Sequence, residues 1–295
     1  MDLVSLVWLL LLGAIWGASY MLIKIGVAEM EPITFAMVRV FFGTLVLALV
    51  VRVQGQTIPH AKRDWRRYLF MGTFNTFLPF AAISWGTQHI PSGVASILNA
   101  TMPLFVFVLV SASGIERISW WRVLGLLVGF SGIVVLTLPR LQGGLNVGLL
   151  ASLAIVASAL SYSVATVFAR RHMSGYPPIV SSLGQVGTGW ALLAVASFVV
   201  ERPLAHPVSA TPLAVAGFLG AVGTALAYLI YYRLIRTVGA TRTAMISFII
   251  PLFGVFWGWL VLGEQLSWHA FAALGLIVIG LVLVNDLLGL SHRRA

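Results

Sequence analysis

The sequence predicts an all-α integral membrane protein with ten transmembrane helices, arranged as two inverted five-helix repeats. Three observations predict this fold: the composition, the number of long apolar segments and an internal repeat. Of the 295 residues, 60% are hydrophobic and only 9% are charged, whereas soluble domains carry about 25% charged residues. A water-soluble globule is therefore excluded, and little sequence remains for a soluble catalytic domain.

Ten apolar segments follow one another along the chain with short connections. A membrane-spanning helix needs about 20 mainly apolar residues, and the segments have about that length. The first segment has no preceding Lys or Arg and no small-residue cleavage site, so we expect a membrane helix there and not a signal peptide. The segments cover residues 3–23, 33–51, 68–87, 93–114, 121–138, 146–168, 178–200, 212–232, 243–262 and 269–289.

The basic residues orient the predicted bundle. Fourteen of the 18 Lys and Arg residues fall in the loops on one side of the segments, three fall on the other side, and Arg39 lies inside the second segment. Cytoplasmic loops carry the excess of Lys and Arg, so we expect both termini in the cytoplasm and the protein in a bacterial-type inner membrane. This asymmetry also explains the formal charge of +10 without a nucleic-acid partner.

An internal repeat relates the two halves of the chain. A shift of 148 positions aligns the Pro-Leu-Phe of residues 103–105 with that of residues 251–253. Nearer the N-terminus, a shift of 146 positions aligns Pro32-Ile33 with Pro178-Ile179. Shared apolar composition does not explain matched prolines in register, so the halves are interpreted as duplicates.

The repeat sets the expected domain organisation, with residues 1–141 forming the first repeat and residues 142–295 the second. Each repeat holds five segments, an odd number, so the second repeat enters the membrane in the opposite orientation. Inverted repeats of this kind are typical of secondary transporters, whose substrate site lies between the halves near the bilayer midplane.

Three sequence features also suggest a family: the two Pro-Leu-Phe motifs, the acidic residues Glu116 and Glu264 that follow them, and Trp16-Gly17 in the first segment. With these features each half resembles an EamA repeat of the drug/metabolite transporter superfamily, and the resemblance covers nearly the whole chain. It implies a ten-helix exporter of small metabolites or drugs. The length and the aromatic richness are similar to those of YddG-like exporters of aromatic and other amino acids.

Polar and aromatic residues gather at middle depth in the predicted segments. Such groups need a partner or a wet cavity in lipid, so we expect a central chamber between the repeats. Trp16 and Tyr162, partners in the repeat, are expected to flank a substrate, and the polar side chains to donate or accept hydrogen bonds. For each residue alone, helix packing or an interfacial position is the alternative. The substrate-binding candidates are Trp16, Asn75, Asn99, Tyr162, Tyr228 and Ser247.

Pro103 and Pro251 are expected to bend the fourth and ninth segments, because proline removes a helical hydrogen bond. As repeat copies they are candidate hinges, and a static kink is the alternative. Arg39 lies about six residues into the second segment, roughly 9 Å at 1.5 Å per residue. We expect it to reach the interface or to pair with Glu29 or Glu31, and contact with a substrate carboxylate is the alternative.

Two further patterns predict packing and capping. Glycine pairs with small-xxx-small spacing let helices approach closely. Glu116 and Glu264 fall at predicted helix ends, where capping or loop hydrogen bonding is expected. The glycine pairs are Gly13/Gly17, Gly125/Gly129 and Gly254/Gly258.

The sequence therefore favours a secondary transporter that exports small metabolites by alternating access. Aromatic and other neutral amino acids are the expected substrates; the alternatives are purine-like bases or amphiphilic drugs, and outside this class a channel or lipid scramblase. Phosphorylated substrates are disfavoured because no Lys or Arg is expected at mid-span. The chain has no Cys and no metal, nucleotide or hydrolase motif. We thus expect no enzyme activity, no cofactor and no metal, and a monomer in the lipid bilayer.

Overall fold

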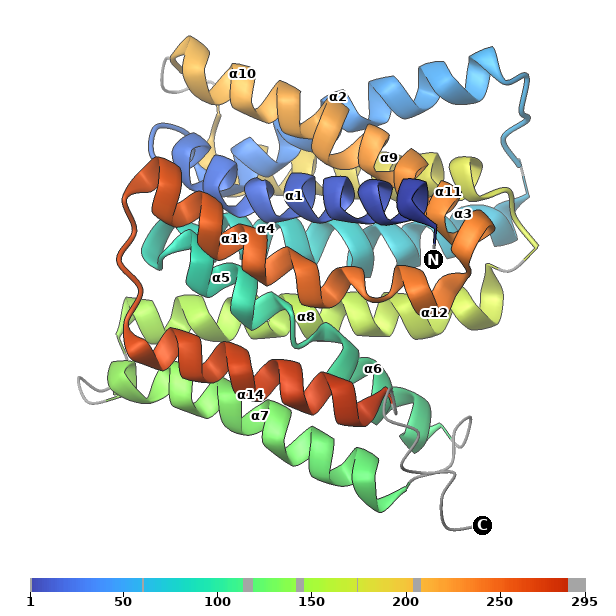
Figure 1. Ribbon diagram of the computed structural model, residues 1–295. Coiled ribbons are helices and arrows are strands. Elements are labelled where there is room, and N and C mark those ends of the chain that lie inside the picture. Colours follow the sequence, from blue (N-terminus) through green and yellow to red (C-terminus); the bar gives the residue numbers. More distant parts are fainter. Residues whose placement is uncertain are drawn as a thin grey trace.

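The computed structural model describes residues 2–59, 61–113, 119–141, 146–173, 175–203 and 208–285. Within these ranges the regular elements are all helices, as predicted. Glu116, Asp286 and the basic residues of the C-terminal end, on which part of the sequence interpretation rested, lie outside the described residues. The elements are labelled in chain order in Figure 1.

Helices cover each of the five segments predicted in the first half. The third segment corresponds to three elements that run on from one another, and the fourth is broken in two. These elements are α1 (Leu3–Gly26), α2 (Pro32–Val53), α3 (Lys62–Gly72), the π-helix η1 (Thr73–Phe77), α4 (Leu78–His89), α5 (Ser92–Asn99), α6 (Met102–Ala112) and α7 (Trp120–Leu141).

The second half follows the same order. Its third segment again contains a π-helix, and the shift of 146 positions that aligns the two sequences also takes the first residue of η1, Thr73, to the first residue of η3, Leu219. The elements are α8 (Val147–His172), α9 (Pro178–Ala196), η2 (Ser197–Glu201), α10 (Ala210–Phe218), η3 (Leu219–Leu226), α11 (Ala227–Val238), α12 (Ala240–Thr243), α13 (Ile246–Leu262) and α14 (Trp268–Val284).

The length and composition of the helices suit a membrane-spanning protein. Within the described ranges, seven helical stretches are long and apolar enough to cross a membrane, and α13 and α14 are shorter apolar helices. Many large apolar side chains on the outside of the bundle are exposed, among them Leu49, Val199 and Phe271. Lipid tails can cover such a surface, whereas water cannot do so without cost.

Local sequence explains where several helices begin. Asp2 caps α1 by accepting a hydrogen bond from the Ser5 backbone N–H at 3.3 Å, and Asn146 caps α8 in the same way. Pro32 and Pro178, which the repeat aligns, each occupy the first position of a helix. Proline fits there because its missing N–H has no intrahelical partner at that position.

Helices of the two halves pack against one another in matching pairs. Two contacts join elements that the internal repeat aligns, α2 with α9 and α7 with α14. Two further contacts correspond to each other under the same alignment, α1 against α13 and α8 against α5 and α6. In Figure 1, α7 and α14 form a pair at one edge of the bundle, and the start of α1 and the last turn of α14 point toward the same end.

Glycines allow helices to approach closely at two of these contacts. A β-carbon at Gly17 would lie only 2.5 Å from Phe253 Cβ, across the α1–α13 contact. A β-carbon at Gly125 would lie 2.6 Å from Leu283 Cβ, across the α7–α14 contact. The predicted packing role of the glycine pairs is therefore confirmed for these helices.

The two prolines predicted to bend equivalent segments occupy different local structures. Pro103 is the second residue of α6 and follows a break at residues 100–101. Pro251 lies inside α13, and the break of that segment comes earlier, at residues 244–245. The two prolines therefore do not occupy equivalent local structures, and the bends themselves stay a prediction. A helix start costs no hydrogen bond at proline, whereas an interior position does, so the two sites are not energetically equivalent.

Candidate functional site

Side chains of neighbouring helices donate hydrogen bonds to backbone carbonyls of the π-helices η1 and η3. Ser161 of α8 donates to the Phe74 carbonyl in η1 at 2.7 Å. Trp16 of α1 donates through Nε1 to the Gly223 carbonyl in η3 at 3.1 Å. Each half therefore satisfies a π-helix carbonyl of the other half. π-helical segments occur often at functional sites, and lipid offers no alternative partner for a freed carbonyl.

Polar side chains from both halves meet near the first π-helix. The Asn75 amide of η1 donates to Gln185 Oε1 of α9 at 3.0 Å and approaches the Tyr228 hydroxyl of α11 at 3.5 Å. One helical turn beyond Tyr228, the Tyr232 hydroxyl contacts Ser182 Oγ at 3.0 Å. The two tyrosine rings stack with centroids 6.1 Å apart.

A second set of contacts surrounds the break between α5 and α6. Asn99, the last residue of α5, accepts a hydrogen bond from Ser158 Oγ of α8 at 3.1 Å. Ser163 of the same helix donates to the Met102 carbonyl at 2.8 Å. Because α8 holds both sides of the break, the break is a defined feature of the packing.

Arg39 of α2 is buried between these groups. Its side chain is only 8% exposed, and its Cζ lies 4.6 Å from the centroid of the Phe80 ring in α4. Tyr20, Tyr162 and Tyr228 lie within electrostatic range of the guanidinium. Its Nε is buried without a hydrogen-bond partner.

This position corrects the expectation that Arg39 reaches the interface or pairs with Glu29 or Glu31. Glu29 instead accepts a hydrogen bond from Ser209 Oγ at the start of α10, and no ion pair joins Arg39 to an acidic residue in the described part of the chain. Arg39 is close enough to the start of α2 that its long side chain could have extended outward to the interface. The guanidinium instead lies over the Phe80 ring inside the bundle, and residue spacing along α2 does not reveal this contact.

Five of the six predicted binding residues thus belong to one group of neighbouring contacts, which we call the central polar cluster. The sixth, Ser247, is only half-buried in the first turn of α13 and forms no side-chain hydrogen bond to the cluster within the described residues. The candidates predicted from the sequence do not include Gln185 and Phe80, and the sequence predicts Arg39 at the interface. The signal that points to a buried Arg39 is that it is the one basic residue inside a predicted segment. The cluster consists of Trp16, Tyr20, Arg39, Asn75, Phe80, Asn99, Tyr162, Gln185 and Tyr228.

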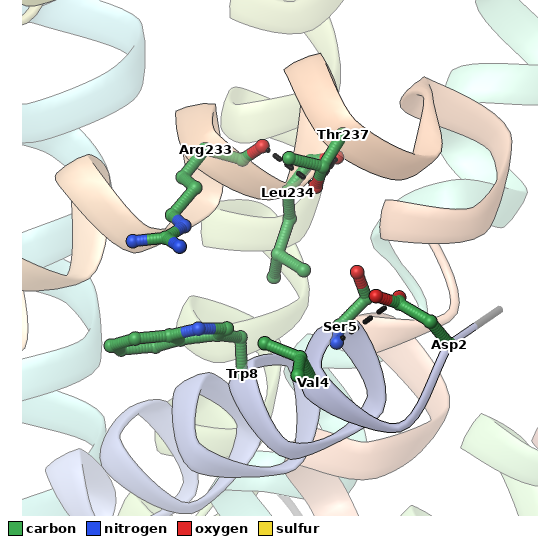
Figure 2. Close-up of a pocket in the computed structure, with 7 residues that line it drawn as sticks. All are labelled: Asp2, Val4, Ser5, Trp8, Arg233, Leu234 and Thr237. Carbon is green, nitrogen blue, oxygen red and sulfur yellow. Dashed lines mark hydrogen bonds between the residues drawn. The ribbon is translucent and has the colours of Figure 1, made fainter.

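At the end of the bundle where α1 begins, a pocket of about 240 Å³ lies between α1 and α11. Figure 2 shows the Arg233 guanidinium above the Trp8 ring, with Cζ 5.1 Å from the ring centroid. The pocket between α1 and α11 is lined by ordinary helix-end residues and is separate from the central polar cluster.

The connection between α8 and α9 is joined to α3 by Tyr176. The Tyr176 hydroxyl donates a hydrogen bond to Asp64 and accepts one from Arg67.

The opposite end is held by carboxylates that cap helices. Glu264 accepts hydrogen bonds from the Ser92 and Gly93 backbone N–H groups at 2.7 and 3.1 Å, which confirms its predicted capping role. Glu201 caps α2 through the N–H groups of Ile33 and Thr34. A second pocket of about 260 Å³ lies at this end beside Glu201.

A helical bundle with long apolar helices and polar groups gathered at mid-helix defines a multi-pass membrane protein. Its family is shown by comparison with known proteins. The EamA-like transporter family matches residues 3–138 and 149–286, so the chain belongs to this family of membrane transporters, whose named relatives are not enzymes.

Individual relatives are distant but cover most of the chain. The chain is 24% identical over 253 residues to the uncharacterized transporter YoaV of Bacillus subtilis, covering 86% of this chain and 87% of that protein. It is 27% identical over 277 residues to the uncharacterized inner membrane transporter YedA of Escherichia coli K12, covering 92% and 87%. It is 26% identical over 302 residues to a "Probable amino-acid metabolite efflux pump" of the same bacterium, covering 97% and 95%.

The fold is also similar to that of a solved protein. A crystal structure superimposes on the whole of this chain and of its own with a TM-score of 0.66 at 20% sequence identity. At this identity the likeness concerns the fold alone.

Proposed function

We propose that the protein is a secondary carrier that exports small metabolites by alternating access, with amino acids as its substrates. The observation that carries the proposal is the central polar cluster, in which side chains from both halves meet near the middle of long apolar helices. Polar groups at this depth are costly, and those that are kept usually mark a substrate or ion pathway. The named amino-acid metabolite efflux relative supports the same substrate class.

The proposed architecture has ten membrane-spanning helices in two inverted repeats, residues 1–141 and 142–295. Matching contacts between the halves support it, since α2 contacts α9 and α7 contacts α14. The aligned starts of η1 and η3 support it as well. In carriers of this kind, one repeat rocks against the other around a central site.

We further propose that both termini are cytoplasmic in a bacterial inner membrane, with the protein acting as a monomer. Basic residues support this orientation, because helix ends on the side where α1 begins carry most of them. An activity reporter that works only in the periplasm, fused after Ala295, should stay inactive. Strong reporter activity would reverse the orientation.

The transport proposal is tested with purified protein in sealed liposomes. A panel of labelled amino acids, one purine base and one amphiphilic dye would be loaded and their efflux followed, with empty liposomes as the control. Saturable efflux of an amino acid, with competition by its unlabelled form, is expected. Efflux of the dye or base alone would favour the multidrug or purine alternative. Non-saturating flux, or movement of labelled lipid between leaflets, would favour a channel or a scramblase.

The positions of the acidic side chains bear on whether transport is coupled to protons. The acids of the described chain all lie at helix ends or in connections: Asp2, Glu29, Glu31, Asp64, Glu201 and Glu264. Proton antiporters usually expose a titratable acid at mid-membrane, so we propose export down the substrate's own gradient. Uphill accumulation driven by an imposed pH gradient in sealed liposomes would contradict this.

A further inference from the structure

Arg39 is the one charged side chain that is buried among the described residues. An arginine stays protonated in proteins, so this site holds a permanent positive charge. Moving an unpaired charge out of water is costly, and buried charges in proteins are normally paired. The bundle therefore contains a cation whose counter-ion is not part of the described chain.

The acidic residues of the described chain are engaged or distant. Glu201 caps α2 and Glu264 caps α5 through backbone N–H groups. Glu29 and Asp64 accept hydrogen bonds from Ser209 and Tyr176 at opposite ends of the bundle. Asp2 caps α1 at its start, and Glu31 is exposed just before α2, so no carboxylate of the described chain is placed to neutralise the guanidinium.

The surroundings of Arg39 favour an anion of limited charge. The Phe80 ring covers one side of the guanidinium at 4.6 Å, and a cation–π contact offsets only part of the desolvation. On another side Gly223 has no side chain, and a β-carbon there would lie 3.9 Å from Arg39 Nη2. Tyr162 and Tyr228 add hydroxyl groups that can donate to an anion.

The other basic residue inside a helix near the cluster is already used. Lys24 donates to the Thr87 carbonyl in the last turn of α4 at 3.2 Å and to the Ile90 carbonyl just after it at 2.8 Å. One guanidinium without a second cation matches one carboxylate, which it can bind through two parallel hydrogen bonds. A phosphate group, with up to two charges, would be left partly unpaired.

We propose that Arg39 binds the carboxylate of the transported substrate, so that the carrier selects compounds with a single carboxylate group. This inference rests on the proposed function and specifies its substrate class. The aromatic side chains of Trp16, Phe80 and Tyr162 then contact the rest of the molecule, as suits an amino acid with an apolar or aromatic side chain. Arg39 is a binding residue of the first half, and its repeat partner Gln185 is neutral, so the carboxylate site belongs to one half only.

Binding is tested directly on purified protein in detergent by ligand-induced thermal stabilisation. The probes are acid and amide pairs that differ only in the charged group: acetate with acetamide, phenylacetate with phenylacetamide, and L-phenylalanine with L-phenylalaninamide. In the wild-type protein at least one acid should stabilise more than its amide. In Arg39→Gln the affinity for that acid should fall by about 10- to 100-fold, because a hydrogen-bonded charged contact contributes about 1.5–3 kcal/mol. The affinity for the amide should be unchanged.

Two variants control for other effects. Arg39→Lys keeps the charge without the two-pronged geometry and should lose part of the affinity. Arg233→Gln removes another arginine that lies over an aromatic ring, at the end of the bundle, and should keep the wild-type acid preference. If Arg39→Gln does not fold, the acid and amide comparison in the wild-type and Arg39→Lys proteins still decides the question.

The outcomes separate this inference from the proposed function. No acid preference in the wild-type protein, equal acid preference in Arg39→Gln, or equal stabilisation by chloride would each overturn the carboxylate site. If the acid preference depends on Arg39 while no amino acid leaves liposomes, the transport proposal fails and the binding site stands. If amino acids are exported with the same preference over amides in Arg39→Gln, the transport proposal stands and the site is wrong.

Discussion

The cap formed by Glu264 gives a stability prediction whose size can be worked from the structure. Its carboxylate joins the connection after α13 to the first turn of α5, 172 residues earlier in the chain. Three groups donate to it: the Ser92 N–H at 2.7 Å, the Ser92 hydroxyl at 3.0 Å and the Gly93 N–H at 3.1 Å. Glu264→Ala removes all three acceptor contacts and leaves two backbone donors at a helix start without partners.

Hydrogen bonds to charged groups contribute about 1.5–3 kcal/mol each, but loss of a helix cap costs about 0.5–2 kcal/mol because water replaces part of the interaction. For three contacts at a partly buried position, we expect a loss of about 2–4 kcal/mol. At about 2–4 °C per kcal/mol for larger domains, the unfolding midpoint should fall by about 4–16 °C. Glu264→Gln keeps one acceptor oxygen and should lose about half as much.

The assay is thermal unfolding of the detergent-purified protein, followed by circular dichroism and by loss of the monodisperse chromatographic peak. Glu31→Ala is the matched control, because Glu31 also precedes a helix at this end but is exposed and forms no side-chain cap. Its midpoint should change by less than about 2 °C, because surface substitutions usually change stability by less than about 0.5 kcal/mol. A midpoint for Glu264→Ala equal to that of Glu31→Ala would refute the reasoning.

Other predictions concern the cluster, the prolines and the packing. Trp16→Ala and Tyr162→Ala should lower transport at least tenfold while the protein remains monodisperse; unchanged kinetics in both would move the substrate site elsewhere. Pro103→Ala and Pro251→Ala together should slow turnover in liposomes more than they weaken substrate binding, and a normal rate would leave both prolines a static role. Gly17→Leu should prevent the α1–α13 contact and abolish the monodisperse peak, because its side chain has no space beside Phe253; a folded, stable variant would show that the contact can relax.

Several features of this protein follow from sequence alone, because they depend on local composition and spacing. Apolar length predicts where the helices lie, and the predicted segments coincide with helices throughout the described chain. Proline at the first position of α2 and α9 predicts two helix starts. The glycine pairs at Gly13/Gly17 and Gly125/Gly129 predict close helix contacts, although the sequence does not name the partner helices.

The same sequence reasoning identified only some of the residues that meet in the central polar cluster. Asn75 and Asn99 stand out because polar residues are rare in apolar segments, and both take part in contacts between elements. Ser247 satisfies the same criterion but does not join the cluster. A helix position specifies a depth, whereas the direction in which a side chain points depends on how its helix is rotated against its neighbours.

Length and apolar pattern therefore determined the helices and their order, and the repeat determined which elements correspond. Tertiary structure decided which distant residues meet: Asn75 contacts Gln185 across 110 positions, and Trp16 contacts the Gly223 carbonyl across 207. It also decided that Arg39 is buried beside Phe80 and does not reach the interface. The physical reason is that helix formation is driven by neighbouring residues, whereas the partner of a buried charge is fixed by the packing of whole helices from both halves of the chain.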